Sequence, residues 1–150
     1  MADAFVAGAV FDQGHPPALA LYCSDGRFTA AVEELAAHLG HPRLDTVTLP
    51  GGAALLDQGA AMLSDRDALS RALALLVDRH AIRFVLLVGH QGCGYYAARH
   101  PLLDGERLRA RQQADLRGAR DRLRQAWPGL EVALFFARPD RQRVSFEPVP

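Results

Sequence analysis

Apolar residues along this chain fall into short continuous runs that alternate with longer segments, where they recur every three or four positions. The short runs are typical of buried strands, and the longer segments are typical of amphipathic helices. The pattern predicts strands at 18–22, 44–49, 84–88, 130–137 and 144–147, and helices at about 27–39, 64–80 and 105–126, with a further short helix after the turn at 89–94. Strands that alternate with helices favour βαβ units, so the predicted fold class is α/β with a mainly parallel sheet.

The boundaries of these elements also carry recognisable signals. Gly40 and Pro42 follow the first helix and supply a stop for it. The segment Arg138–Asp140 contains a proline and is predicted as the turn between the last two strands. No linker, internal repeat or low-complexity stretch divides the 150 residues, so we predict one domain spanning 1–150.

Composition and charge narrow the class of protein. Hydrophobic residues make up 49% of the chain and charged residues 23%, which excludes a disordered or fibrous protein. The 17 basic and 17 acidic residues cancel, so no overall field draws the chain to nucleic acid or to an anionic membrane. Every basic residue is Arg, and Lys and Asn are absent, which is typical of a GC-rich bacterial genome. No export signal or membrane span is visible, and a cytoplasmic location is expected.

The positions of the two cysteines are the first chemical signal. Cys23 directly follows the first predicted strand, and Cys93 comes shortly after the third, with His90 between that strand and Cys93. Ligands of open α/β sheets bind outside the carboxyl ends of the strands, where these three side chains converge if the two strands are neighbours. Two thiolates and an imidazole suit zinc, and three protein ligands leave a fourth position open, as in catalytic zinc sites. A disulfide is the alternative, but it is disfavoured in a reducing compartment.

The segment Cys23-Ser24-Asp25-Gly26-Arg27 supplies the second chemical signal, a carboxylate and a guanidinium close to the first cysteine. In an extended backbone, alternate residues point to the same side, so Cys23, Asp25 and Arg27 would share one side. A guanidinium next to a carboxylate keeps the carboxylate ionised and oriented. Asp25 would then be able to accept a hydrogen bond from a water molecule on the metal.

Together these two motifs resemble those of the beta-class carbonic anhydrases. That family combines Cys-x-Asp-x-Arg after one strand with His-x-x-Cys-Gly after a later one, and this chain has CSDGR at 23–27 and HQGCG at 90–94. The resemblance extends in element order from about residue 19 to the end of the chain. It implies a beta-carbonic-anhydrase-like sheet, with strand order about 2-1-3-4 plus an antiparallel edge strand and helices on both faces.

The resemblance also implies a function and a set of site residues. Cys23, His90 and Cys93 would bind Zn²⁺, and Asp25 and Arg27 would form the catalytic dyad that supports it. The implied reaction is the reversible hydration of carbon dioxide to bicarbonate by zinc-bound hydroxide. The family further implies a homodimer or a higher homo-oligomer, and a second state in which the dyad aspartate, here Asp25, leaves the arginine and becomes the fourth zinc ligand.

The chain departs from the family pattern in three places. Only 22 residues precede Cys23, where typical members have a longer helical arm that carries a bicarbonate-binding glutamine, and Gln13 is the one glutamine in this stretch. Pro50-Gly51-Gly52 stands where typical members have an Arg-Asn-Ala-rich segment, and Gly26 replaces a common serine. Two alternatives follow, namely a zinc hydrolase of carbonyl sulfide or carbon disulfide, and a zinc-binding homologue of weak activity.

Parts of this sequence are also compatible with two other kinds of function. Cys93 at a helix N-terminus with His90 as its base would suit a cysteine nucleophile, but this leaves Cys23, Asp25 and Arg27 unexplained. The predicted helix at 105–126 carries seven Arg and three acidic residues between 106 and 124, which would suit a binding module for RNA or an acidic partner. No aromatic residue lies among these arginines, so a solvated helix face is the favoured interpretation.

Overall fold

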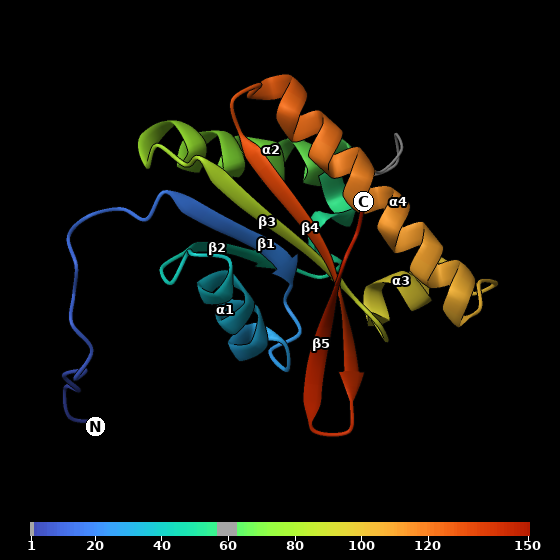
Figure 1. Ribbon diagram of the computed structural model, residues 1–150, viewed down its shortest axis with the longest axis horizontal. Helices are drawn as coiled ribbons and strands as arrows, with labels where there is room; N and C mark the ends of the chain where they lie inside the picture. The colour runs from blue at the N-terminus through green and yellow to red at the C-terminus, as the bar shows by residue number, and fades with distance from the viewer. Residues whose placement is uncertain (1, 57–62) are drawn as a thin grey trace.

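The structure is a computed structural model, and it describes residues 2–56 and 63–150. Its centre is a five-stranded sheet with the order β2-β1-β3-β4-β5 (Figure 1). The strands are β1 (Ala18–Cys23), β2 (Asp45–Leu49), β3 (Phe84–His90), β4 (Glu131–Asp140) and β5 (Arg143–Pro148). The helices are α1 (Thr29–His38), the 3-10 helix η1 (Gly52–Leu56), α2 (Leu63–Arg79), α3 (Gly94–Arg99) and α4 (Gly105–Ala126). The first four strands are parallel and β5 is antiparallel to β4, which confirms the predicted fold class and strand order.

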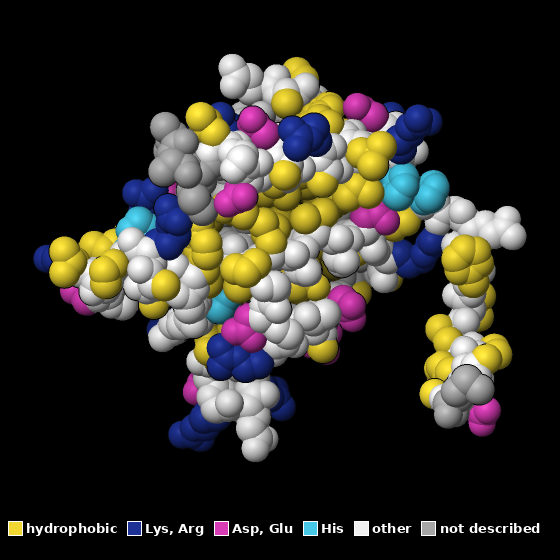
Figure 2. All heavy atoms as spheres, turned by 180° about the vertical axis from the view of Figure 1, so that it is seen from behind, with side chains coloured by type: hydrophobic (Ala, Val, Ile, Leu, Met, Phe, Trp, Pro, Cys, Tyr) yellow, Lys and Arg dark blue, Asp and Glu magenta, His cyan; other side chains and the backbone are white. Residues whose placement is uncertain are grey.

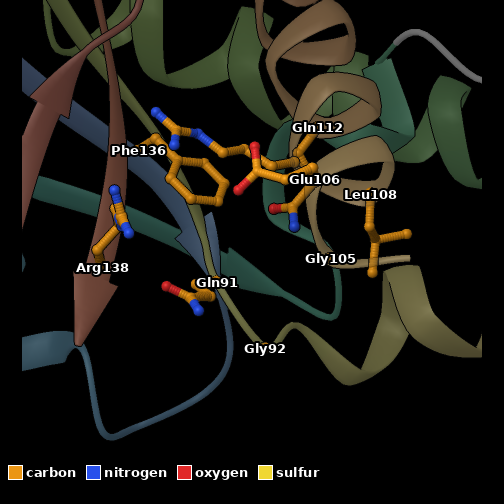
Figure 3. Close-up of a pocket in the computed structure, with 9 residues that line it drawn as sticks. Gln91, Gly92, Gly105, Glu106, Leu108, Gln112, Phe136 and Arg138 are labelled. Atoms are coloured by element: carbon orange, nitrogen blue, oxygen red, sulfur yellow. The ribbon is translucent and has the colours of Figure 1, made fainter. Parts of the chain in front are cut away.

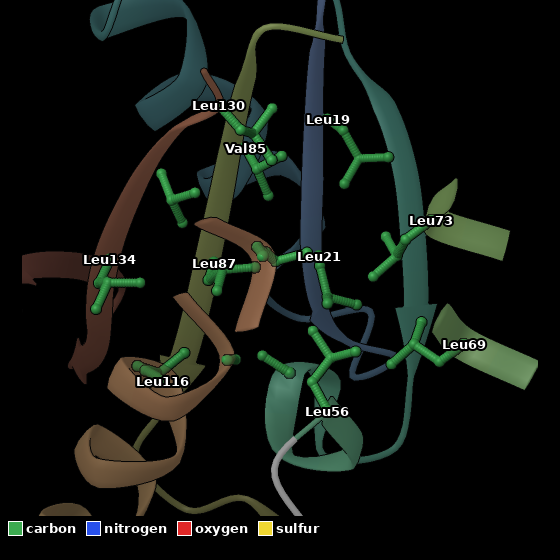
Figure 4. Packing of buried hydrophobic residues seen from close by; sticks show 14 of the residues in the cluster. Leu19, Leu21, Leu56, Leu69, Leu73, Val85, Leu87, Leu116, Leu130 and Leu134 are labelled. Carbon is green, nitrogen blue, oxygen red and sulfur yellow. The ribbon is translucent and has the colours of Figure 1, made fainter. Parts of the chain in front are cut away.

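Helices cover both faces of the sheet, and this explains why β1 and β3 are continuously apolar. Side chains of a strand alternate between the two faces. Ala18 and Ala20 therefore join the cluster under α1, whereas Leu19 and Leu21 join the cluster under η1, α2 and α4 (Figure 4). The members of the second cluster that Figure 4 labels are Leu19, Leu21, Leu56, Leu69, Leu73, Val85, Leu87, Leu116, Leu130 and Leu134. The strand ends that carry the site are thus fixed by a core on each side.

The first helix ends as its sequence predicts. Gly40 has a φ of +89°, a conformation that glycine adopts without a steric cost. Its N–H donates to the carbonyl of Ala37, and the N–H of His41 donates to the carbonyl of Ala36. This pair of hydrogen bonds is a Schellman motif, which satisfies carbonyl groups at the end of α1 and returns the chain toward β2.

The turn between the last two strands was predicted at Arg138–Asp140, and this placement is wrong. Residues 138 to 140 belong to β4, where Pro139 pairs with Val144, and the turn lies at 141–142 with Arg141 at a φ of +52°. Beyond Ala137, β4 pairs with β5 alone. Proline is tolerated in such an edge pairing because its missing N–H can face solvent.

The N-terminal segment extends away from the body of the molecule (Figures 1 and 2). Arg43 anchors its base, since the guanidinium bonds the carboxylate of Asp12 and the carbonyl of Gly14. Farther out, large apolar side chains are almost fully exposed: Phe5, Val6, Val10 and Phe11. We call residues 3–15 the arm. In the described part of the chain, no helix is both long and apolar enough to cross a bilayer.

Candidate metal centre

The register of the central strands brings the two sequence motifs together. Tyr22 of β1 pairs with Val88 of β3 in the parallel sheet. Cys23 is the residue after Tyr22, and His90 lies two residues after Val88, so both end at the same edge. Cys93 follows a turn that contains Gly92 at a φ of +73°, and it occupies the N-cap of α3. Two segments separated by about half the chain thereby meet at the carboxyl ends of β1 and β3.

At this edge, three potential ligand atoms form one compact group. One atom each from Cys23, His90 and Cys93 lies within 4.8 Å of the others. The two sulfur atoms are 3.9 Å apart. Two thiolates at the usual Zn–S distance of about 2.3 Å in a tetrahedral site would be separated by about 3.8 Å. The donor set and its spacing therefore fit a zinc ion, and the structure brings together the three residues that were predicted as ligands.

The His90 ring presents one particular nitrogen to this group. Its Nδ1 lies 2.9 Å from the carbonyl oxygen of Gln91, and a carbonyl can only accept, so Nδ1 carries the proton. Its Nε2 is buried and has no hydrogen-bond partner. A buried polar atom without a partner is costly, and a lone pair held in this way is the usual arrangement of a histidine that binds a metal. The ring also packs against Phe28, with 4.3 Å between the centroids.

The two thiols are electrostatically coupled. The pKa of Cys23 is lowered, chiefly because the Cys93 thiol bonds to its sulfur and also because backbone groups of Gly51 and Asp25 do. The pKa of Cys93 is raised, because the same bond stabilises its protonated form and because its sulfur is buried. The bond between the two sulfur atoms therefore favours the loss of one proton over the loss of both, and a cation in the site would favour loss of the second proton.

The segment after β2 closes over Cys23 through two glycines. Gly51 and Gly52 have φ values of +81° and +54°. A Cβ on Gly52 would lie 2.8 Å from the backbone carbon of Tyr22, and one on Gly51 would lie 2.4 Å from the Tyr95 ring. Only glycine therefore lets this segment approach Cys23 closely enough for the Gly51 amide to bond to the sulfur.

Asp25 and Arg27 form a pair beside the group. The Arg27 Nη2 atom lies 2.6 Å from Oδ2 of Asp25, and Nε lies 2.9 Å from Oδ1. This two-point bond is the main reason why the pKa of Asp25 is lowered to about 2. The Asp25 side chain is 22% exposed and that of Arg27 is 75% exposed, so the pair lies at the mouth of the site. The carboxylate is a fixed acceptor at neutral pH.

Sequence reasoning missed three buried residues near this centre, namely Gln112, Asp115 and Tyr96. Gln112 of α4 hydrogen-bonds to the backbone of His90, and Asp115 of the same helix accepts from the Tyr96 hydroxyl. In the sequence, a glutamine and an aspartate within an Arg-rich helix resemble ordinary surface residues. Only their burial distinguishes them, and that burial depends on how α4 packs against the sheet. On the rest of this helix, Asp121 contacts Arg120.

A comparison with models of protein families identifies one family. A family model described as "putative carbonic anhydrase" matches residues 15–145. No curated protein matches the sequence.

Several solved structures share the fold at low sequence identity. The beta-carbonic anhydrase CafA of Aspergillus fumigatus superposes with a TM-score of 0.58 at 16% identity, covering 89% of this chain and 76% of that one. A chain from a structural study of two tetrameric beta-carbonic anhydrases of Sordaria macrospora superposes with a TM-score of 0.56 at 16% identity, covering 89% of this chain and 81% of that one. A carbonic anhydrase of Streptococcus mutans gives 0.58 at 13% identity, covering 95% and 88%. At identities this low, the superpositions establish a shared fold and nothing more.

Proposed function

The chain belongs to the putative carbonic anhydrase family, and from this premise we propose that it is a zinc enzyme that reversibly hydrates carbon dioxide to bicarbonate. The observation that carries the proposal is the group formed by Cys23, His90 and Cys93 at the carboxyl ends of β1 and β3. Two sulfur atoms at zinc-ligand spacing and a buried imidazole nitrogen without a partner account for the choice of metal.

The three residues would hold the metal in different ways. Cys23 and Cys93 supply thiolates, and His90 supplies Nε2, because Nδ1–H is already committed to the Gln91 carbonyl. Zinc bound there would lower the pKa of water to near neutrality and so supply the nucleophile. Asp25 lies beside this group, at its exposed edge.

Asp25 and Arg27 would orient the reacting water. Arg27 keeps Asp25 ionised, so the carboxylate accepts a hydrogen bond and does not donate one. Because Arg27 fixes this acceptor at two points, a water molecule bonded to it can adopt only a few orientations. The pair would thus contribute to the reaction by positioning the water. With Asp25 bound to Arg27, the carboxylate is not available as a fourth ligand in this conformation.

The experiment that tests the activity is stopped-flow hydration of carbon dioxide by protein of measured zinc content. Cys93→Ser and His90→Ala are expected to lose zinc and activity together. Full zinc content in both variants would exclude the proposed ligands. Zinc-loaded wild-type protein that hydrates no carbon dioxide would refute the reaction, and carbonyl sulfide and carbon disulfide would then be assayed as substrates.

We also propose that the chain assembles with copies of itself. Four large apolar side chains of the arm are 86–94% exposed, and the arm is anchored at its base so that it projects from the body (Figure 2). Exposed apolar side chains that are gathered on one projecting segment are typical of a surface that is covered in an assembly. Sedimentation of the wild type is expected to show a dimer or a larger species, and Phe5→Glu with Phe11→Glu is expected to shift it toward the monomer. A monomeric wild type would refute this assembly.

A further inference from the structure

Helix α4 buries two polar side chains on the face that it turns toward the sheet. Gln112 is 3% exposed and Asp115 is 4% exposed, in a row that otherwise buries apolar residues. Buried polar groups are costly unless they are hydrogen-bonded. Both of these side chains bond to the stretch of chain that carries His90 and Cys93: Gln112 bonds to His90, 22 positions earlier, and Asp115 bonds to Tyr96, 19 positions earlier.

Gln112 bonds to His90 at two points. Its Oε1 accepts from the His90 N–H at 3.2 Å, and its Nε2 donates to the His90 carbonyl at 3.0 Å. Figure 3 shows its side chain reaching from α4 toward the end of β3. Gly89 makes this approach possible, since a Cβ there would lie 3.2 Å from Oε1 of Gln112.

The two hydrogen bonds from Gln112 take the place of pairing with β1, which ends before it reaches His90. The last pair between β1 and β3 is Tyr22 with Val88, so β1 ends before it reaches His90. The next peptide group, at Gln91, donates to Ala137 of β4. Successive residues of a strand turn their peptide groups to opposite neighbours, so the groups of His90 face the side where β1 has ended. The amide of Gln112 supplies the donor and the acceptor that a longer β1 would have supplied.

Asp115 acts on the other ligand segment through Tyr96. The Tyr96 hydroxyl donates to Oδ2 of Asp115 at 2.8 Å, while Arg111 Nε lies 3.0 Å from Oδ1. Both carboxylate oxygens are therefore engaged. Tyr96 belongs to the first turn of α3, and its backbone N–H bonds to the sulfur of Cys93. Holding the Tyr96 ring thus fixes the helix start from which Cys93 projects.

We propose that Gln112 and Asp115 are positioning residues for the metal centre, Gln112 through the backbone of His90 and Asp115 through Tyr96. The inference rests on the proposed metal site and deepens it, because it assigns one face of α4 to holding the His90–Cys93 half of that site. Neither side chain bonds to the sulfur or imidazole atoms that are proposed as metal ligands. A purely structural role would lower the stability of the protein without changing the metal geometry.

The first test uses Gln112→Met, which removes both hydrogen bonds and keeps a side chain of similar length. Gln113→Met is the matched control, because it makes the same substitution at the next, half-buried position of α4. Zinc affinity is measured by competition with a chromophoric chelator, and the visible spectrum of the Co²⁺-substituted protein reports the ligand geometry. We expect Gln112→Met to weaken zinc binding about 10–100-fold and to alter the cobalt spectrum. Gln113→Met is expected to match the wild type in both.

The second test removes one oxygen atom. Tyr96→Phe keeps the ring but loses the bond to Asp115, whereas Asp115→Asn keeps an oxygen that accepts from Tyr96. We expect Tyr96→Phe to weaken zinc binding and shift the cobalt spectrum, and Asp115→Asn to retain more of the wild-type spectrum. Urea unfolding of the metal-free variants separates these effects from a general loss of stability.

The outcomes distinguish this inference from the proposed function. A wild-type chain that binds neither zinc nor cobalt would overturn both. A wild type that binds zinc, together with Gln112→Met and Tyr96→Phe variants of unchanged affinity and spectrum, would overturn the positioning roles alone. The same holds if the variants lose stability while their cobalt spectrum stays that of the wild type.

Discussion

Gly52 offers a sharp test of how the segment after β2 supports Cys23. Its backbone has a φ of +54°, and a Cβ added there would lie 2.8 Å from the backbone carbon of Tyr22 and 2.9 Å from the backbone nitrogen of Cys23. Both neighbours are backbone atoms of β1, so neither can move aside as a flexible side chain would. Gly52→Ala must therefore displace either η1 or the end of β1.

Two further glycines separate the causes. Gly40 has a φ of +89° but open space around its Cβ position, so Gly40→Ala measures the conformational cost alone. Gly26 has neither a left-handed φ nor a close neighbour, so Gly26→Ala serves as the neutral control. The left-handed conformation costs a non-glycine residue about 1–2 kcal/mol, and overpacking a closed site adds about 1–3 kcal/mol.

These terms give a predicted order of stability. Gly26→Ala should change the free energy of unfolding by less than about 0.5 kcal/mol. Gly40→Ala should lower it by about 1–2 kcal/mol, and Gly52→Ala by about 2–5 kcal/mol. Urea unfolding of the metal-free proteins measures all three values.

Zinc affinity provides the second readout. Only Gly52→Ala shifts the backbone of a proposed ligand, so only this variant is expected to bind zinc more weakly. The reasoning would be refuted if Gly52→Ala were no less stable than Gly40→Ala and bound zinc as tightly as Gly26→Ala did.

Three other perturbations have defined outcomes. Asp25→Asn should keep zinc and lower turnover about 10–100-fold, because the charged acceptor held by Arg27 is lost, and stopped-flow kinetics with a zinc assay checks this; unchanged turnover would exclude the dyad. Phe28→Ala should lower the free energy of unfolding by about 3–5 kcal/mol, since a buried ring against His90 is removed, and a urea midpoint equal to that of the wild type would contradict it. Removal of zinc by a chelator should lower the melting temperature, because a ligand present at 100 times its Kd stabilises the folded state by about 2.7 kcal/mol; calorimetry that shows no shift would argue against a bound metal.

Much of the fold could be predicted from local sequence signals. The helix at 105–126 and the start of the central strand at Phe84 have the predicted bounds, because hydrophobic period and capping residues act within a few positions. The hairpin turn was misplaced for the complementary reason. Pro139 signals a turn locally, but its pairing with Val144 is set by how far β5 follows β4.

The candidate site also has a part that local sequence predicts and a part that depends on long-range packing. The sequence by itself determined which residues are candidates for the chemistry, since Cys23, His90 and Cys93 follow strand ends at a recognisable spacing, and Asp25 and Arg27 are two positions apart. Only the tertiary structure decided what holds them in place. The bonds from Gln112 to His90 and from Asp115 to Tyr96, and the approach of Gly52 to β1, join residues about 20 to 30 positions apart. No periodic pattern encodes such contacts, because they exist only once α4 and η1 have packed against the sheet.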